Sequence, residues 1–199
     1  MDADKVILEI FATEDTSDNL PRLLKRGNRV DLGRVFKKLQ FMKGVEVGTR
    51  KGEFATALCD ANRDMHLWCV DPWMAYDAGH GVASQERQEK LYAHAMNQIK
   101  GHNITVIRKT SMDAVSEFED QSVDFVYIDA NHQFDFVVCD LIYWAPKVRM
   151  GGIVALHDYR PGHWAGVVEA VDAYTKCHDI RPWYITREKE PTAFWVRRS

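Results

Sequence analysis

Acidic side chains stand at or near the ends of three apolar segments of the chain. Glu46 lies inside the first segment, Asp71 follows the second and Asp129 follows the third. If these segments are parallel strands, their carboxyl ends meet at one edge of a sheet, where open α/β folds bind ligands. Carboxylate oxygens accept hydrogen bonds from hydroxyl groups and from cations. The pattern therefore predicts a polar binding site at that edge.

Two glycines four positions apart, Gly48 and Gly52, follow the first apolar segment, and a helical pattern begins directly after them. Strand, glycine turn and helix in this order are typical of nucleotide-binding units. Glycine adopts positive φ and lets a ligand approach the main chain, while the helix start offers free N–H groups. A tight turn that binds nothing explains two glycines equally well, and their spacing differs from that of the dinucleotide fingerprint.

Asp71 stands about 20 residues after the glycine turn, the distance at which an acid grips a nucleoside ribose in such folds. The alternative is a turn or helix-cap role before Pro72. Trp73 either stacks on an adenine ring or closes the core. The long stretch that follows, residues 74–84, reads as a loop at the ligand-facing edge, where Tyr76 and His80 are candidates for acceptor contacts.

Two histidines lie where later apolar segments reach the same edge: His132 follows Asp129, and His157 precedes Asp158. A histidine has an ordinary pKa of about 6.5, which suits it to general-base catalysis near neutral pH. These four residues form the only dense polar cluster predicted there. We expect Asp129, His132 and His157 to be catalytic; for either histidine, a structural or cofactor-contacting role is the alternative.

In the rest of the sequence, apolar segments alternate with segments whose apolar residues recur at helical spacing. Five strand–helix units lead to two C-terminal strands joined by a short charged connection, which predicts an antiparallel hairpin. Nearer the start, Asp18 could cap a short helix that ends at Gly27. A longer helix is predicted after Asp31, packed on the sheet edge or over the ligand site. The fold class is therefore α/β, an open and mostly parallel sheet.

This plan resembles the class I methyltransferases that depend on S-adenosylmethionine (SAM). The residues that carry the resemblance are the runs 46–52 and 70–73 and the segment from Asp124 to Tyr159, and the small O-methyltransferase branch is the most similar. The resemblance implies a Rossmann-like sheet with helices on both faces and one antiparallel strand. It also implies a single methyltransferase domain over residues 1–199, with an N-terminal helical extension at 1–40 and a core at 41–199.

Carried onto this chain, the resemblance assigns the cofactor site residue by residue. Ser111 and Met112 would border the adenine, through the serine hydroxyl or backbone amide and the methionine side chain; Ser111 as a plain helix N-cap is the competing interpretation. Glu46 would face the methionine amino group and Asp71 the ribose. The complete set expected to bind SAM is Glu46, Gly48, Thr49, Arg50, Gly52, Asp71, Pro72, Trp73, Ser111, Met112 and Asp129.

The metal-dependent members of this branch place an acid after the fourth strand and an acidic pair after the fifth. Asp129 and Asp158 match that pattern and predict a divalent ion, Mg²⁺ or similar, with His157 or Asn131 nearby. His157 stands where the family has the first acid of the pair, so a metal-free site with His132 or His157 as the base stays open. The N/D-P-P-Y/F motif of many amino-group methyltransferases is absent after Asp129, which favours an oxygen acceptor.

Composition narrows the functional classes. The 199 residues carry a net charge of −3 with a pI of about 6.2, which makes nucleic acid an unexpected partner. The apolar runs are too short to span a membrane and the charged N-terminus lacks a signal-peptide pattern, so we expect a cytoplasmic protein. A small molecule or sugar is the expected acceptor. The alternatives are a protein or RNA methyltransferase and a SAM-binding module without transfer activity. The oligomeric state stays open, a homodimer included.

Overall fold

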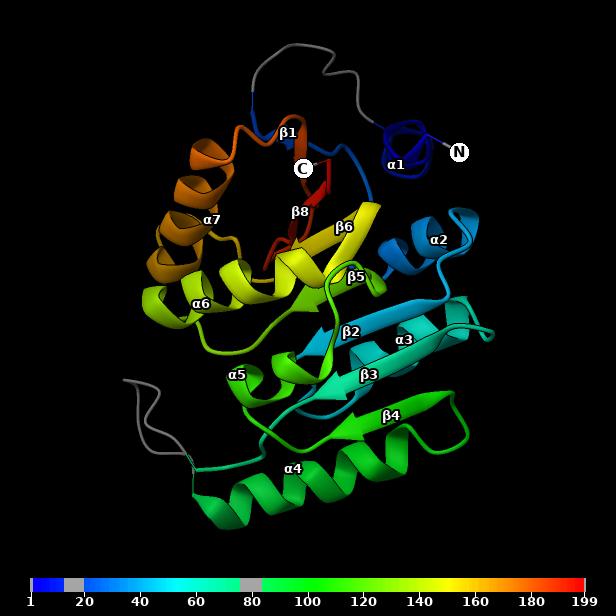
Figure 1. The fold of residues 1–199 in the computed structure, drawn as a ribbon, viewed down its shortest axis with the longest axis vertical. Helices are drawn as coiled ribbons and strands as arrows, with labels where there is room; N and C mark the ends of the chain where they lie inside the picture. The colour runs from blue at the N-terminus through cyan, green and yellow to red at the C-terminus, as the bar shows by residue number, and fades with distance from the viewer. Residues whose placement is uncertain (1, 13–19, 76–83, 199) are drawn as a thin grey trace.

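A computed structural model describes residues 2–12, 20–75 and 84–198. Its centre is an eight-stranded sheet in the order β1-β7-β8-β6-β5-β2-β3-β4 (Figure 1). The strands are β1 (Arg22–Leu23), β2 (Lys43–Val47), β3 (His66–Val70), β4 (Ile104–Ile107), β5 (Val123–Ile128), β6 (Val148–Leu156), β7 (Trp183–Ile185) and β8 (Ala193–Val196). The helices are α1 (Ala3–Phe11), α2 (Asp31–Lys38), α3 (Glu53–Ala61), α4 (Gln85–Gln98), α5 (Ser111–Ala114), α6 (Phe134–Trp144) and α7 (Ala165–Cys177), with short 3₁₀ turns at Val115–Glu117 and Ala145–Lys147.

Strand β8 is the only antiparallel member among the described strands: it pairs antiparallel with both β6 and β7, while every other neighbouring pair is parallel. The predicted C-terminal hairpin and the mostly parallel Rossmann-like sheet are therefore confirmed. Because β2, β3, β5 and β6 are parallel, their carboxyl ends meet at one edge. That edge receives the glycine turn and the acids predicted from the sequence.

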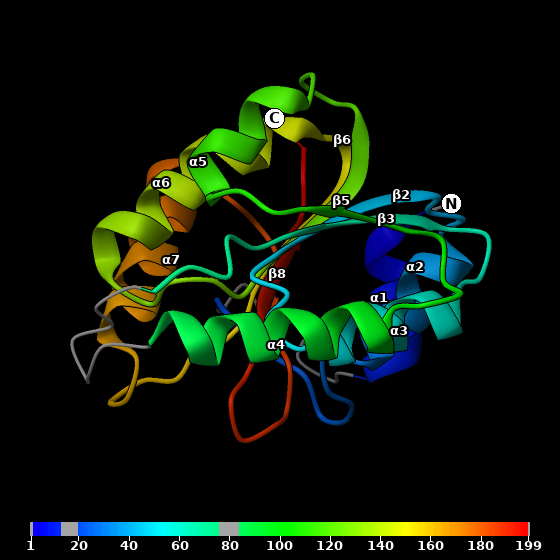
Figure 2. The same ribbon diagram turned by 90° about the horizontal axis from the view of Figure 1, so that it is seen from below.

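Helices cover both faces of the sheet, as expected, and divide the core into two layers (Figure 2). Helices α1 to α4 pack on one face over a buried cluster that includes Leu32, Leu58 and Phe125. Helices α5 to α7 pack on the other over Val126, Leu141 and neighbouring side chains. Alternate strand residues point to opposite faces, which explains why neighbours such as Phe125 and Val126 belong to different layers. No helix within the described ranges has the length and apolar composition needed to cross a membrane.

The N-terminal region differs from the sequence prediction. The described part of the helix expected to end at Gly27 is not helical: residues 22–23 form β1, which pairs in parallel with β7 at the sheet edge, and Asp18 lies outside the described residues. A two-residue strand has no periodicity to detect, so its pairing partner decides its structure. The segment 1–40 is therefore not helical throughout.

Helix α2 begins at Asp31, close to the prediction. Of its two expected placements, the one on the sheet edge is wrong, because α2 packs over β5 in the middle of the sheet. The Phe36 ring stacks on Phe125 of β5, with centroids 4.0 Å apart. The residues just before α2 consequently reach the carboxyl edge of the sheet. This placement brings an N-terminal loop to the candidate site.

Candidate active site

The glycine turn after β2 is built around a close approach between two backbone segments. Gly48 has φ of 96°, and a Cβ there would lie 2.1 Å from the carbonyl oxygen of Asp129. Gly52 has φ of 77° and is the N-cap of α3, where a Cβ would lie 3.0 Å from Ile99 Cγ2. Both positions therefore require glycine, for conformation and for space. The turn lies directly against the backbone that carries Asp129.

Asp71, which directly follows β3, accepts a hydrogen bond from the backbone of this turn. Its Oδ2 accepts a hydrogen bond from Arg50 N at 2.8 Å, and its Oδ1 accepts one from Trp73 N at 2.8 Å. Burial raises the pKa of the Asp71 carboxyl, and these two N–H donors counteract part of that rise. Each oxygen retains a further lone pair, so the turn role and the ribose role predicted for Asp71 are compatible.

Trp73 closes the core, the second of its two expected roles. Its side chain is 1% exposed, its Nε1 donates to Arg50 O at 2.9 Å, and its ring meets Tyr92 edge-on. In the described part of the chain, the indole therefore has no exposed face on which an adenine ring could stack. Pro72 before it is partly exposed.

The turn before α5 differs from the prediction in its cap. Thr110, not Ser111, is the N-cap, since its hydroxyl accepts from Asp113 N. The Ser111 hydroxyl instead accepts from Trp144 Nε1 at 2.7 Å and donates to the buried Asp140. The hydroxyl is thereby committed to α6, which leaves the backbone amide of Ser111 and the exposed side chain of Met112 as the groups that can meet a ligand.

Glu46 is buried one residue before the end of β2, with 2% of its surface exposed. Burial raises the pKa of its carboxyl to about 8, against a smaller opposing effect of the Thr49 hydroxyl. Cys69 of the neighbouring strand approaches it, with Sγ 3.6 Å from Oε2. A buried carboxyl of this kind accepts a cationic ligand readily, because the ligand's charge offsets the cost of ionising it.

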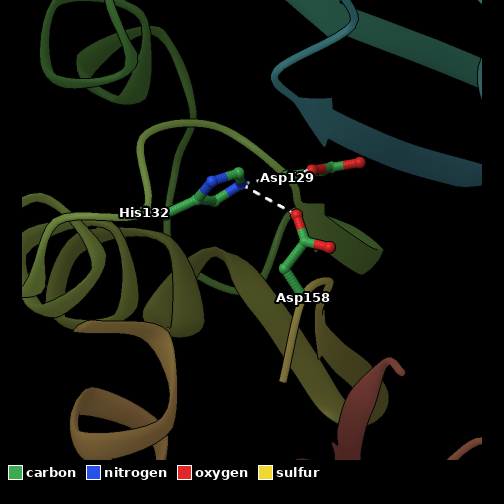
Figure 3. Close-up of side chains that lie close together, drawn as sticks. All are labelled: Asp129, His132 and Asp158. Carbon is green, nitrogen blue, oxygen red and sulfur yellow. Dashed lines mark ion pairs between the residues drawn. The ribbon is translucent and has the colours of Figure 1, made fainter. Parts of the chain in front are cut away.

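The predicted histidine–aspartate cluster is present at the ends of β5 and β6, and Figure 3 shows three of its members, Asp129, His132 and Asp158. His132 Nε2 lies 2.9 Å from Asp158 Oδ2 and 3.8 Å from Asp129 Oδ1. His157 Nδ1 lies 3.2 Å from Asp158 Oδ1 and 3.4 Å from Asp129 Oδ2. The two imidazoles and two carboxylates therefore alternate, so that each histidine faces both acids.

This alternation sets the charges of the cluster. Burial by itself lowers the pKa of His132, but the carboxylates of Asp129 and Asp158 outweigh it and raise that pKa to about 9. Burial and the same two carboxylates act on His157 in the same way. Burial likewise opposes ionisation of the acids, yet the histidines hold the pKa of Asp129 far below its ordinary value and that of Asp158 at about 2. Near neutral pH the cluster therefore favours charged carboxylates on both aspartates and a proton on His132.

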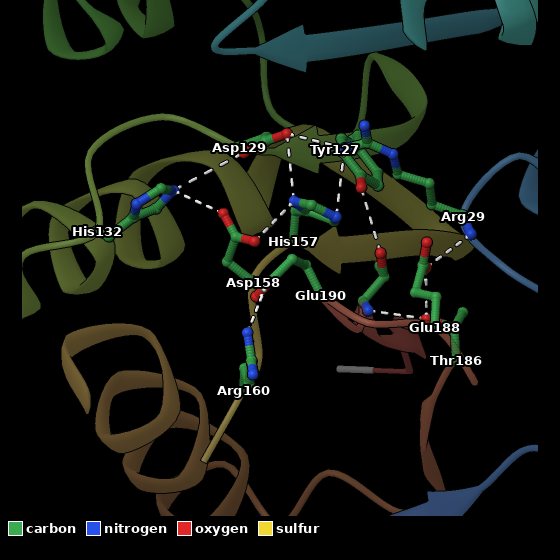
Figure 4. A network of polar contacts seen from close by, with 11 residues as sticks. Arg29, Tyr127, Asp129, His132, His157, Asp158, Arg160, Thr186, Glu188 and Glu190 are labelled. Carbon is green, nitrogen blue, oxygen red and sulfur yellow. Dashed lines mark hydrogen bonds and ion pairs between the residues drawn. The ribbon is translucent and has the colours of Figure 1, made fainter. Parts of the chain in front are cut away.

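Arg29, from the loop before α2, completes the network (Figure 4). Its Nη1 lies 3.1 Å from Asp129 Oδ2 and 3.3 Å from His157 Nε2. Glu188 anchors the same loop by accepting from Arg29 N at 2.8 Å and from Thr186 Oγ1 at 2.8 Å. A guanidinium offers donors only, so its approach to His157 Nε2 opposes protonation of that ring. Sequence reasoning missed Arg29, which follows no strand predicted from the sequence and belongs to no recognisable motif.

The backbone at Asp158 is strained. Its φ is 61°, in the left-handed region that residues other than glycine seldom adopt, although aspartate tolerates it better than most. Close packing on the other side is allowed by Gly166 of α7, where a Cβ would lie 2.3 Å from His132 O. Gly166 therefore lets α7 lie close to the backbone of His132.

The donor atoms also suit a cation. Asp129, His132 and Asp158 each offer one ligand atom, and these atoms lie within 4.8 Å of one another. The side chain that completes the set is therefore His132, not the His157 or Asn131 expected nearby. Asn131 is engaged locally, since its Oδ1 accepts from Gln133 N at 2.8 Å. Two carboxylates and an imidazole fit Mn²⁺ or a similar transition metal better than Mg²⁺, which prefers oxygen ligands. Tyr76 and His80 lie outside the described residues.

A family model described as a methyltransferase domain matches residues 45–159. An uncharacterised protein of Sinorhizobium fredii, y4gI, is 29% identical over 118 residues, which are 57% of this chain and 13% of that protein. This chain thus spans a small part of that relative's length.

Solved structures share the fold. The O-methyltransferase NovP superposes with a TM-score of 0.65 at 18% identity, covering 86% of this chain and 78% of NovP. The O-methyltransferase TomG from Streptomyces achromogenes, solved in complex with SAM, has a TM-score of 0.62 at 14% identity and covers 99% and 89%. At these identities the likeness establishes the arrangement of strands and helices.

Proposed function

Because this chain belongs to the methyltransferase-domain family, we propose that it transfers the methyl group of SAM to a hydroxyl oxygen of a small molecule. The observation that carries the proposal is the contact between the Gly48 turn and the backbone of Asp129. It places a turn of the kind that binds nucleotides beside a cluster of acids and histidines. A methyl donor held by the turn would lie beside groups able to orient a hydroxyl and take its proton.

In this proposal the cofactor lies at the carboxyl ends of β2, β3 and β4. Asp71 would accept from the ribose hydroxyls through the lone pairs that its two backbone bonds leave. The Ser111 amide and Met112 would border the adenine. Glu46, which is buried on β2 next to the glycine turn, would receive the amino group of the methionine moiety, because that group supplies the positive charge that the carboxylate needs.

The acceptor half is the cluster after β5 and β6. Methyl transfer from a sulfonium needs oxygen, carbon and sulfur in line, so positioning is the main task of the protein. The hydroxyl also has to lose its proton. His132 is the better placed histidine for this, because its side chain is 29% exposed whereas that of His157 is 10% exposed and faces Arg29. Asp158 and Asp129 would orient His132 and hold the acceptor.

Asp129, His132 and Asp158 would hold a divalent ion if one binds. A bound ion lowers the pKa of a hydroxyl that coordinates to it. His132 has to be neutral to act either as a ligand or as a base, so in both cases the cluster must first release a proton. Arg29 adds positive charge beside the site, which weakens cation binding.

The direct test is mass spectrometry of the purified protein for co-purified SAM or S-adenosylhomocysteine (SAH), followed by an acceptor screen with isotopically labelled SAM. The proposal expects SAH binding and label transfer to a hydroxyl-bearing small molecule. Labelling of protein or RNA in place of small molecules would contradict the acceptor class. Retention of SAM with no turnover on any acceptor pool would indicate a binding module.

A further inference from the structure

Helix α6 has apolar side chains on both of its sides. Val137, Leu141 and Trp144 are buried in the core of their layer. The opposite side, which we call the outer face of α6, carries Phe134, Phe136, Val138, Cys139, Ile142 and Tyr143. A helix that is apolar all round is normally buried all round. The sequence of α6 is therefore that of a helix covered from both sides.

The outer face of α6 is nevertheless open in a single chain. Phe136 is 54% exposed, Tyr143 53%, Ile142 49% and Phe134 45%. No other Phe, Tyr or Trp in the described ranges is exposed. Exposed apolar residues that stand singly are normal, whereas a contiguous group of them marks a binding surface.

Helical spacing joins these side chains into one surface. They form two adjacent rows, one of Phe134, Val138 and Ile142 and the other of Phe136, Cys139 and Tyr143. Asp135, in the first turn, is the only charged residue of α6 on this side, since Asp140 is buried. Helix α6 lies between α5 and α7 and contacts both, so its outer face points away from the sheet (Figure 1).

A small ligand does not account for this face. Phe134 and Tyr143 are separated by roughly 13 Å along the helix axis. An acceptor held at His132 could reach Phe134, but it could not also cover Tyr143. A membrane fits poorly, because helices that lie on membranes are rich in Lys and Arg and α6 contains neither. A protein surface is the remaining kind of partner.

The area of the outer face matches what a symmetric dimer needs. At about 100 Å² for each half-exposed side chain, the four most exposed residues present roughly 400 Å² of apolar surface, and two copies present roughly 800 Å². Because about 65% of a homodimer interface is apolar, the complete contact would bury about 1,200 Å², the lower bound for specific interfaces. The composition also fits, since aromatic residues are enriched and charged residues depleted at the centre of interfaces.

We propose that the outer face of α6 binds the same face of a second copy of this chain. A two-fold axis through the middle of the patch covers all of it and lies next to Cys139. The two α6 helices then run antiparallel, with Asp135 of each copy opposite Tyr143 of the other. The tyrosine hydroxyl can donate to that carboxylate, which satisfies the one charge on the face.

Sedimentation of the full chain over a range of concentrations tests the dimer. Phe136→Glu should raise its dissociation constant at least about a hundredfold, because the substitution enters the contact twice and aromatic residues dominate such interfaces. Tyr143→Glu, at the other end of the face, should act in the same way. Met42→Glu is the matched control, because Met42 is 46% exposed and lies between α2 and β2, and α2 belongs to the opposite layer.

Cross-linking tests the position of the axis. A short bismaleimide, which adds to two thiols without a redox step, should join two copies through Cys139. Cys59 and Cys69 are buried, and Cys177 is exposed at the end of α7. Covalent dimers should therefore form with the wild type and with Cys177→Ser, and should be lost with Cys139→Ser.

Circular dichroism establishes that each variant is folded. A wild type that sediments as a monomer at every concentration would overturn the proposal, and so would a dimer that survives both Phe136→Glu and Tyr143→Glu. Cross-linking that persists in Cys139→Ser would refute the two-fold arrangement. A monomer that binds vesicles of neutral or anionic phospholipid through this face, and loses that binding in Phe136→Glu, would assign the face to a membrane in place of a second copy.

Discussion

Arg29 Nη1 lies 3.1 Å from Asp129 Oδ2, although a hundred positions separate the two residues in the chain. The guanidinium adds to the two histidines that already face this carboxylate, and together they keep Asp129 ionised despite its burial. A carboxylate with so low a pKa is a weak base. Asp129 is therefore suited to hold and orient other groups, and proton removal falls to a group of higher pKa.

Because Gly48 lies so close to the carbonyl oxygen of Asp129, adding one methyl group at Gly48 should destabilise the fold strongly. Gly48→Ala would place Cβ against a backbone carbonyl that cannot move independently, and we expect a loss of more than about 3 kcal/mol in the free energy of unfolding. Gly101→Ala is the control: its φ of 87° is equally unfavourable, but no atom lies within 4 Å of the added Cβ. That variant should lose only about 1 kcal/mol, the cost of the left-handed conformation. Urea unfolding measures both, and similar losses would refute the close-approach argument.

The proximity of the Gly48 turn and Asp129 could be predicted from the sequence, because the carboxyl ends of parallel strands meet at one edge of a sheet. Arg29 could not, since only the packing of α2 on Phe125 carries its loop to the site. The roles of Trp73 and Ser111 stayed open for a related reason. A side chain in a turn can face the ligand or the core, and its hydrogen-bond partners, Arg50 O and Asp140, are set by tertiary contacts.

Asp71 supports both the glycine turn and the proposed ribose contact. Asp71→Ala should weaken SAH binding ten- to hundred-fold, since a charged hydrogen-bond acceptor is worth roughly 1.5–3 kcal/mol. Isothermal titration calorimetry measures the change. Asp64→Ala is the matched control, because Asp64 is exposed at the amino end of β3, on the far side of the sheet from the site. Unchanged SAH affinity in folded Asp71→Ala would remove this residue from the cofactor site.

The donor set of Asp129, His132 and Asp158 predicts metal preference. Mn²⁺ should bind at least about tenfold more tightly than Mg²⁺, because one ligand is an imidazole nitrogen. Binding should release protons, which calorimetry detects as a dependence of the heat on the ionisation enthalpy of the buffer. Asp158→Asn should weaken Mn²⁺ binding, whereas Asp113→Asn, at an exposed acid of the α5 cap, should not. Equal affinities for the two ions would refute the assignment of His132 as a ligand.

The raised pKa of His132 makes part of the stability depend on pH. A histidine whose folded pKa is about 9, against about 6.5 when unfolded, stabilises the fold fully below pH 6.5 and loses that effect as the pH rises through 9. His132→Gln should therefore reduce the free energy of unfolding most near pH 6, by up to about 2 kcal/mol after allowance for solvent exposure, and least near pH 10. Urea titrations with a chelator present test this. His94→Gln, on the exposed face of α4, should show no such trend, and a flat difference for His132→Gln would contradict the assigned ion pairs.

The rate of turnover tests whether His132 takes the proton from the acceptor hydroxyl. Near neutral pH His132 carries a proton between Asp129 and Asp158, so it can accept one from the acceptor hydroxyl only after losing its own. Once a screen supplies an acceptor, kcat/KM should rise with pH, reach half of its maximum near pH 9, the pKa of His132, and level off above that pH.

His132→Ala should remove that dependence on pH and lower turnover about 10²-fold or more, the usual contribution of a general base, with SAH binding unchanged as the control for folding. His157→Ala should have the smaller effect, because Arg29 occupies the side of the ring at Nε2 and keeps an acceptor from it. If both variants retain near-normal rates, proton removal by histidine is wrong, and alignment of the acceptor oxygen with the sulfonium must account for the rate by itself.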